Sequence, residues 1–263
     1  MRLKEITELF EREFPTSMAM DWDNVGLQVG DLSQEIKSVY VALDATDEVI
    51  EHAINAGADL LITHHPLIFT TVNRVVADDM VGRRLLKMIE NHMAYYAMHT
   101  NFDIAAMGDI VAEKMGVKVS APLEPTGEYA DGKPFGMGFV GELVNDSAVN
   151  LKEFADSVRD NFGLSHVKIF SGNDKIVKRI ACCPGSGKSV VDLALEAGAD
   201  VYVTGDIDHH TGIDAVAMNL PIIDAGHYGL EHIYIEYMVK LIRDNLPELK
   251  VMEEGFKEPF WID

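Results

Sequence analysis

Two adjacent histidines, His64 and His65, directly follow the apolar segment 59–63 (DLLIT). We expect this segment to be a buried strand that ends at Pro66, because proline lacks a backbone donor. In open α/β sheets, ligands bind beyond the carboxyl ends of the strands. Neighbouring side chains of a strand point to opposite faces, so the two imidazoles can reach two metal ions or two sides of one cleft. The alternative for this pair alone is a loop with two solvated histidines.

Histidines and carboxylates also follow two other predicted strands. The strand over 94–98 is followed by His99 and Asp103, and the strand over 221–225 is followed by His227 and Glu231. Glu231 lies one helical turn after His227, so both side chains can face one site. For Asp103 the alternative is a structural one, the N-cap of a helix over about 104–115.

These residue types predict a metal centre. Imidazole with carboxylate suits Zn, Fe, Mn, Co or Ni better than Ca. Five protein ligands exceed the number that one catalytic zinc takes. They suit two ions roughly 3.5–4 Å apart that share a bridging carboxylate and water. The predicted ligands are His64, His65, Asp103, His227 and Glu231. Candidates to orient these ligands from a second layer are His99, Asp206 and His209.

An internal repeat supplies the elements that would position these groups. Residues 53–63 (AINAGADLLIT) align without gaps with 194–204 (ALEAGADVYVT), and the same offset aligns 38–45 with 179–186. Each copy has the pattern of a strand, a helix, a glycine C-cap and a second strand buried on both faces. The repeat predicts an α/β fold of two similar lobes related by internal duplication.

The domain division follows from this repeat. We expect a first α/β lobe over 1–125 and a second over 126–263, with the metal cleft between them and a Gly/Pro-rich linker within 120–138. The sheets should be parallel or mixed. The helix over 228–246 is a candidate to pack back on the first lobe.

Composition limits the classes of function. The 263 residues carry a net charge of −21, with 43 acidic and 22 basic residues, and no cluster of Lys and Arg that would neutralise a nucleic-acid backbone. No apolar segment approaches the roughly 20 residues that span a bilayer, and the N-terminus lacks the apolar core of a signal peptide. Cys182 and Cys183 are adjacent on a predicted strand and poorly placed to bridge each other. We therefore expect a cytoplasmic protein without a membrane partner. The charge disfavours a nucleic-acid partner but does not exclude a nucleic-acid substrate held in a local basic pocket.

The segment 184–189 (PGSGKS) is close to a phosphate-binding loop but does not match one. That motif needs a glycine five positions before the Gly-Lys pair, where this chain has Cys182. We expect a tight turn that lines the cleft.

The motif set resembles the Nif-three-like dinuclear-metal family, whose members are also known as GTP cyclohydrolase 1 type 2 homologues. The resemblance covers essentially the whole chain and is carried by WDNVGLQVG (22–30), THHPLIF (63–69), HTNFD (99–103), GSG (185–187), TGD (204–206) and DAGHYGLE (224–231). The family's five metal ligands fall on the five residues named above. The resemblance further implies a toroidal homohexamer whose metal sites face an internal cavity.

The expected function is that of a metal-dependent hydrolase acting on a nucleotide or a related small molecule, with GTP cyclohydrolase-like chemistry as one form. A dinuclear centre would activate water and polarise a carbonyl or phosphoryl oxygen. The alternative is a non-catalytic metal-binding ring or adaptor protein.

Overall fold

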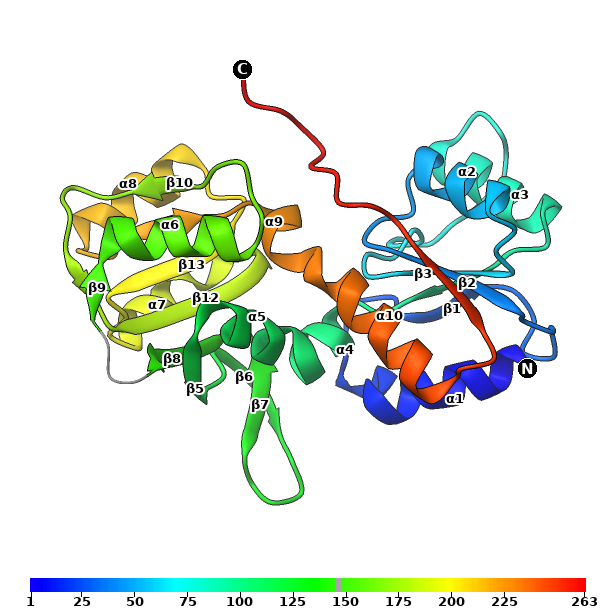
Figure 1. Cartoon of the computed structure of the whole chain (residues 1–263), viewed down its shortest axis with the longest axis horizontal. Coiled ribbons are helices and arrows are strands. Elements are labelled where there is room, and N and C mark those ends of the chain that lie inside the picture. The colour runs from blue at the N-terminus through cyan, green and yellow to red at the C-terminus, as the bar shows by residue number, and fades with distance from the viewer. Residues whose placement is uncertain (145–147) are drawn as a thin grey trace. The chain divides into compact units, whose positions relative to one another are not determined.

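The computed structural model describes residues 1–144 and 148–263, which divide into two compact units (Figure 1). The first unit comprises Met1–Phe102 and Tyr234–Lys257. The second unit comprises Asp103–Ile233 and Glu258–Asp263. Both units are α/β, and each builds its own sheet.

The first unit contains a five-stranded sheet with the order β1-β4-β3-β2-β15, in which only β1 runs antiparallel to its neighbour. Its strands are β1 (Gly26–Val29), β2 (Ser38–Ala42), β3 (Leu60–Thr63), β4 (Ala94–Ala97) and β15 (Lys250–Glu253). Its helices are α1 (Leu3–Glu13), α2 (Asp47–Asn55), α3 (Met80–Glu90), α4 (Thr100–Phe102) and α10 (Ile233–Asn245), with a 3-10 turn at Thr16–Met18.

Both faces of this sheet are covered. Strands β2, β3 and β4 are buried along their whole length, as expected for strands with helices on both sides. On one face, Tyr40 and Leu61 pack in a core with Ile50 of α2 and Leu85 of α3. The opposite face is covered by the apolar side of α1, whose Phe10 ring lies 5.2 Å from that of Tyr96.

The second unit contains a six-stranded sheet with the order β10-β14-β13-β12-β8-β5 and two short strand pairs, β6-β7 and β9-β11. Its strands are β5 (Val117–Ala121), β6 (Glu124–Glu128), β7 (Pro134–Met137), β8 (Phe139–Leu143), β9 (Val149–Asn150), β10 (Lys168–Phe170), β11 (Ile176–Val177), β12 (Arg179–Ser186), β13 (Val201–Gly205) and β14 (Ile222–Asp224). Its helices are a π-helical turn (Asp103–Met107), α5 (Gly108–Met115), α6 (Leu151–Asn161), a 3-10 turn (Lys188–Val190), α7 (Val191–Glu196), α8 (His209–Ala217) and α9 (His227–Glu231).

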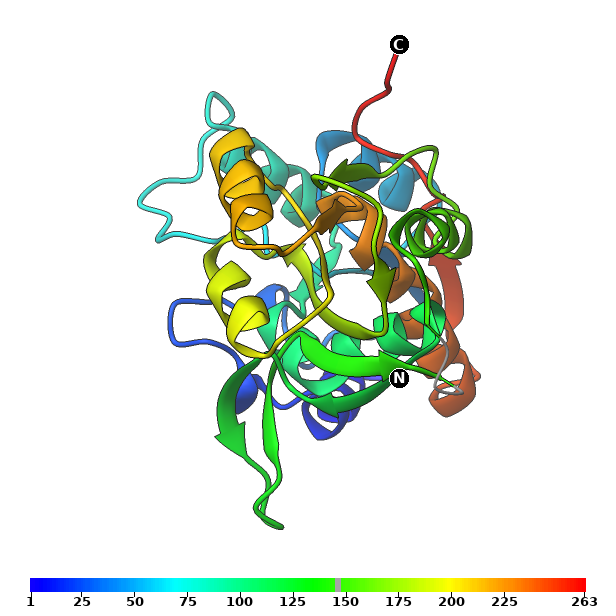
Figure 2. The ribbon, with the colours of Figure 1, turned by 90° about the vertical axis from the view of Figure 1, so that its left-hand side faces the viewer.

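Helices again cover the sheet on both sides. Figure 2 looks onto this unit, with the yellow helices α7 and α8 on one side and the green helix α6 on the other. Ala181 and Tyr202 of the sheet pack in one core with Val191 of α7 and Ala215 of α8. Helix α5 contacts the strands β12 and β8, and helix α9 contacts the strands β12 and β13.

The strand topology agrees with the internal duplication. The neighbours β4-β3-β2 of the first sheet and β14-β13-β12 of the second are all parallel. In each group an antiparallel strand lies beside the member that comes last in the chain, β1 beside β4 and β10 beside β14. The helix before the second strand ends in the same way in both copies. Gly57 and Gly198 follow it with φ values of +72° and +66°, the left-handed conformation of a helix C-cap.

A hydrogen-bond pattern that occurs in both copies of the repeat supports the same conclusion. The carboxylate of Asp59 accepts the backbone N–H groups of Lys37 and Ser38 at 2.8 and 2.9 Å. At the matching positions, Asp200 accepts those of Lys178 and Arg179 at 2.9 and 2.8 Å. In both copies this carboxylate thus joins the beginning of the first strand to the beginning of the second.

The segment expected to be a linker is folded. Residues 120–138 lie largely in β5, β6 and β7, and β5 pairs with β8 as the edge of the second sheet. The boundary between the units therefore falls at Phe102/Asp103, which differs from the expected division at 125/126. The Gly and Pro residues that suggested a linker belong to the β6-β7 hairpin, which extends away from the sheet in Figure 1.

The helix expected over 228–246 is two helices, α9 and α10. Helix α9 belongs to the second unit, and Tyr234–Lys257 belong to the first. The strand β15, which the sequence reading did not include, follows α10 and pairs with β2. Among the described residues, the structure contains no helix of the length and apolarity that crossing a membrane requires.

Candidate metal centre

In the first unit, His64 and His65 lie at the end of β3, as the sequence predicted. The Nδ1 atom of His64 donates to the carbonyl oxygen of Met98 at 2.8 Å, and that of His65 donates to Oδ1 of Asp44 at 2.8 Å. Both acceptors are oxygens without a proton, so each Nδ1 carries a hydrogen, and in the neutral imidazole each Nε2 then has the lone pair. This is the arrangement that metal-binding histidines commonly show.

His99 joins this pair from the end of β4. Its ring centroid lies 5.3 Å from that of His64 and 5.4 Å from that of His65. One ring nitrogen from each of the three lies within 4.8 Å of the others, close enough to hold one metal ion. The sequence reading placed His99 in a supporting layer, and the structure places it in the cluster itself.

A buried carboxylate orients His99. Oδ1 of Asp23 accepts from its Nδ1 at 3.0 Å, and Oδ2 accepts from the backbone N–H and the hydroxyl of Thr100 at 3.0 and 2.6 Å. Burial alone would raise the pKa of Asp23, but the hydrogen bonds from His99 and Thr100 lower it to about 2. Asp23 is therefore a fixed anion that keeps the proton of His99 on Nδ1.

The loop after β3 is fixed by a buried tyrosine. The hydroxyl of Tyr95 contacts the Thr63 hydroxyl at 2.7 Å, donates to the carbonyl of His65 at 3.0 Å and accepts the N–H of Leu67 at 2.9 Å. Because these three bonds hold the backbone on both sides of Pro66, the ring of His65 is directed by both its backbone and Asp44.

In the second unit, His227 and Glu231 occupy consecutive turns of α9. Nε2 of His227 lies 3.0 Å from Oε2 of Glu231. Glu231 is buried, with 3% of its surface exposed. Nδ1 of His227 donates to Oδ2 of Asp206 at 2.8 Å. Asp206 has a φ of +59°, an uncommon conformation for a residue other than glycine, and it follows the end of β13. Asp206 therefore orients the ring of His227.

Two glycines make room for Glu231 and His227. A Cβ on Gly185, which has a φ of +72°, would lie 2.2 Å from Oε1 of Glu231. A Cβ on Gly205 would lie 2.4 Å from the backbone nitrogen of His227. The ends of β12 and β13 thus approach α9 more closely than any side chain would permit.

Asp103 is the first residue of the π-helical turn and is 8% exposed. It lies inside a helical segment, so the alternative role of N-cap is not the one observed. Burial, together with the nearby carboxylates of Asp103 and Glu231, raises the pKa of the Cys183 thiol to about 12. One carboxylate oxygen of Asp103 lies within 4.8 Å of one of Glu231, and two buried carboxylates this close together favour a cation.

The remaining candidates have other surroundings. His209 begins α8 after the N-cap Asp208, and its ring lies 5.2 Å from that of His210. The turn at 184–189 is tight, as expected. The N–H of Gly187 donates to the hydroxyl of Thr204 at 3.0 Å, and the Lys188 ammonium pairs with Asp208, so neither group is arranged for a phosphate.

The supporting residues Asp23 and Asp44 were missed in the sequence. They are 76 and 21 residues from the histidines that they orient. No local spacing connects residues this far apart. The only sequence signal was that each lies in or beside a polar segment at the end of a predicted element.

Comparison with known proteins supports one family. Residues 1–257 match the model of Duf34/NIF3 (NGG1p interacting factor 3). Relatives named "GTP cyclohydrolase 1 type 2 homolog" include one from Clostridium acetobutylicum, 32% identical over 253 residues (95% of this chain and 93% of the relative). Another, from Streptococcus pneumoniae, is 34% identical over 248 residues (92% and 90%).

Solved structures show the same fold. A Bacillus cereus protein related to NIF3 has a TM-score of 0.92 at 24% identity, over 100% of this chain and 99% of that one. Reduced HcgD from Methanocaldococcus jannaschii has a TM-score of 0.83 at 31% identity, over 97% and 98%. With a family match along nearly its whole length, the chain belongs to the Duf34/NIF3 family.

Proposed function

We propose that this protein is a metal-dependent hydrolase with a dinuclear centre. The proposed ligands of the two divalent ions are His64, His65, Asp103, His227 and Glu231. The observation that carries the proposal is shared by four imidazoles. His64, His65, His99 and His227 each donate from Nδ1 to a carbonyl or carboxylate oxygen, which leaves Nε2 of His64, His65 and His227 as the proposed ligand atom and Nε2 of His99 for another role.

The donor set fits such a centre. It combines neutral imidazoles with the buried carboxylates of Asp103 and Glu231, a mixture that suits Zn, Fe, Mn, Co or Ni. Bound divalent ions would supply Lewis acidity and would lower the pKa of water at neutral pH. The identity of the ions and their number of two per chain belong to this proposal.

His99 has a separate role in the proposed reaction. Its Nδ1–H is held by the buried anion Asp23, so its Nε2 can accept a proton and the resulting imidazolium is stabilised by the carboxylate. This orientation resembles the logic of a histidine and aspartate pair in hydrolases. We propose that His99 moves a proton at Nε2 to or from a bound substrate.

The proposed substrate is a nucleotide or a related small molecule. The names of the relatives support a purine nucleotide such as GTP as the first compound to test. The description of the family, which names an interacting factor, favours a second candidate function. In that candidate, the metals stabilise a non-catalytic ring or adaptor that binds another protein.

Turnover distinguishes the two candidates. The full chain, loaded in turn with Mn, Fe or Zn, is tested with GTP, other nucleotides, phosphodiesters and peptides. We expect hydrolysis of at least one class, with loss of activity in His99→Gln and no loss in His209→Gln, whose ring lies at the start of α8. If no compound is hydrolysed by metal-loaded protein, or if His65→Ala retains activity, the adaptor function replaces the hydrolase.

We also propose that the chain assembles as a homohexamer in the cytoplasm. The hexamer is supported by the resemblance of the motifs, and the cytoplasm is supported by the two adjacent free cysteines, Cys182 and Cys183. Light scattering at micromolar concentration should give six times the 29.1 kDa of the chain. A monomer at that concentration would contradict the assembly.

A further inference from the structure

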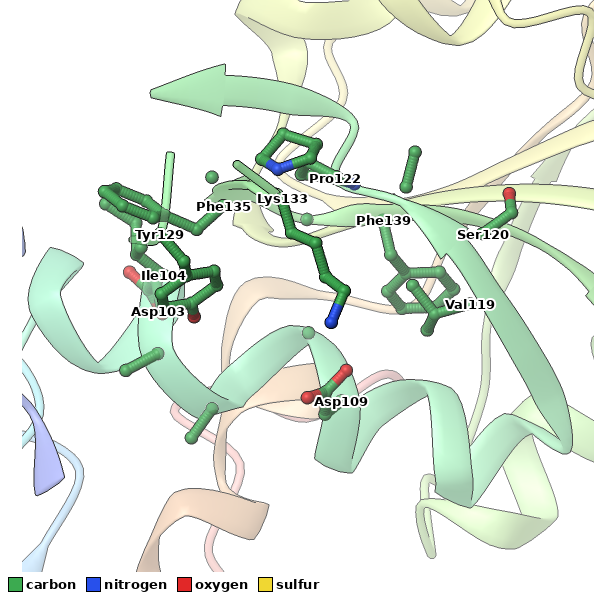
Figure 3. Close-up of a pocket in the computed structure, with 17 residues that line it drawn as sticks. Asp103, Ile104, Asp109, Val119, Ser120, Pro122, Tyr129, Lys133, Phe135 and Phe139 are labelled. Carbon is green, nitrogen blue, oxygen red and sulfur yellow. The ribbon is translucent and has the colours of Figure 1, made fainter. Parts of the chain in front are cut away.

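A cavity of about 290 Å³ in the second unit is lined by Asp103, one of the proposed metal ligands (Figure 3). Its size is at the lower end for small-molecule sites and suits a single ring system. The cavity lies between the helical segment that begins at Asp103, the strand β5 and the β6-β7 hairpin. None of the groups assigned above to the metals or to proton transfer, apart from Asp103, belongs to its lining.

The walls of this cavity differ in shape. Between the larger side chains of Ile104 and Asp109, the helical wall contributes Ala105, Ala106 and Gly108, whose small or absent side chains leave this part of it smooth. The hairpin contributes Tyr129 and Phe135, whose ring centroids lie 5.0 Å apart at 62°. A slot between a smooth wall and aromatic rings accommodates a flat ring, which gains from edge or face contacts with those aromatics.

The hairpin holds its aromatic rings in place. The N–H of Tyr129 donates to the carbonyl of Lys133 at 2.8 Å, and Gly132 takes a φ of +80° in the turn between them. A Cβ on Gly127 would lie 2.4 Å from the Phe135 ring, so that ring lies directly against the glycine backbone. The aromatic wall is therefore built into the hairpin.

One basic side chain lines the cavity. Figure 3 shows Lys133 extending from the hairpin across the cavity toward the helical wall that carries Asp109. Its ammonium pairs with Asp131 at 2.8 Å, but both side chains are more than half exposed, and such surface pairs contribute little. Asp103 and Asp109 also line the cavity, so in a chain with a net charge of −21 the Lys133 ammonium is the group of this lining that would attract an anion.

We propose that this cavity is the substrate-specificity pocket, and that it selects an aromatic or heteroaromatic ring bearing an anionic group. The ring lies between the helical wall and Phe135, the anionic group lies at Lys133, and the part of the molecule nearest Asp103 is the part that reacts. The role in substrate selection rests on the proposed function, whereas the binding of such a ring does not require metal.

Binding to metal-free protein tests the pocket. The full chain is treated with a chelator and titrated by calorimetry with phenyl phosphate, cyclohexyl phosphate and inorganic phosphate. We expect phenyl phosphate to bind about tenfold more tightly than cyclohexyl phosphate, because only the flat ring fits the slot and contacts the aromatics. Inorganic phosphate should bind more weakly than either.

Three variants locate the binding. Phe135→Leu keeps apolar bulk but removes the ring, and should raise the Kd of phenyl phosphate about tenfold. Lys133→Gln should raise it about threefold and should reduce its dependence on salt. Lys152→Gln, which removes an exposed lysine of α6 paired with Asp156, is the matched control and should leave the Kd unchanged. Urea unfolding of each variant shows whether its hairpin and sheet remain folded.

Two results would overturn the pocket. One is equal binding of phenyl and cyclohexyl phosphate, and the other is an unchanged Kd in folded Phe135→Leu and Lys133→Gln. The proposal of the pocket and the proposal of the hydrolase can be rejected independently. Ring-selective binding without any turnover retains the ring site and rejects its catalytic role, whereas turnover without ring selectivity retains the hydrolase and rejects the pocket.

Discussion

The two units place different chemistry at matching strand ends. In the first unit, Asp44 at the end of the first repeat strand supports His65 at the end of the second. The repeat aligns these positions with Gly185 and Asp206. In the second unit the carboxylate therefore lies on the other strand, and it supports His227, which comes from a helix instead of a strand end.

This difference shows which part of a duplicated fold is retained. Both copies keep the carboxylate that joins the starts of their strands, Asp59 in one and Asp200 in the other. The strand ends differ, because Asp44 is matched by Gly185 and His65 is matched by Asp206. Gly185 at the position of Asp44 leaves the space that Glu231 occupies, so the loss of a carboxylate from the strand permits one from the helix.

The largest expected effect comes from filling that space. Gly185→Ala should lower the free energy of unfolding by about 3 kcal/mol, because the added Cβ combines left-handed strain with a clash against Glu231. The matched control is Gly198→Ala, which has a similar φ of +66° but nothing within 4 Å of the added Cβ. It should lose about 1 kcal/mol. Urea unfolding of chelator-treated protein measures both, and equal losses would show that Glu231 does not need this space.

The two supporting carboxylates, Asp44 and Asp206, should contribute equally to metal affinity. Asp44→Ala and Asp206→Ala should each weaken metal binding about 10- to 100-fold, because each removes the oxygen that orients a ligand imidazole. Competition with a chromogenic chelator gives the affinities. Asp208→Ala is the control: it removes an N-cap at the same edge and should lower stability by about 1 kcal/mol without changing metal affinity. A strong effect in only one of the two supports would contradict their equivalence.

A smaller effect concerns acid stability in the first unit. The pKa of Asp23 is lowered to about 2 in the folded protein against about 3.9 in an unfolded chain. Its contribution, about 2 kcal/mol, is therefore present above pH 4 and is lost as the pH falls toward 2. In chelator-treated protein, the stability difference between wild type and Asp23→Asn should shrink over that range. A difference that stays constant from pH 5 to pH 2 would exclude this role for Asp23.

The βαβ cores could be predicted from the sequence because their signals are local. Apolar segments such as 59–63 and the glycines Gly57 and Gly198 fix strands and helix ends within a few residues. The β6-β7 hairpin was not predictable in this way. Its Pro and Gly residues are equally frequent in linkers, and only pairing across the turn distinguishes the two.

Only part of the candidate site could be predicted from the sequence. Residues at strand ends, such as His64 and His99, follow from topology, because parallel strands present their carboxyl ends at one edge. Their supports do not follow. Asp23 reaches His99 across 76 residues, and the role of Gly185 depends on how closely α9 approaches β12. Such contacts arise from tertiary packing and leave no periodic signal in the sequence.

Metal content tests the central claim most directly. Protein purified without a chelator or a histidine tag should contain about two divalent ions per chain by elemental analysis. Glu231→Gln keeps the size of the side chain but removes its charge, and should lose at least one ion, whereas His209→Gln should retain both. Metal-free wild-type protein that cannot be reloaded, or a metal content that Glu231→Gln leaves unchanged, would contradict the dinuclear centre.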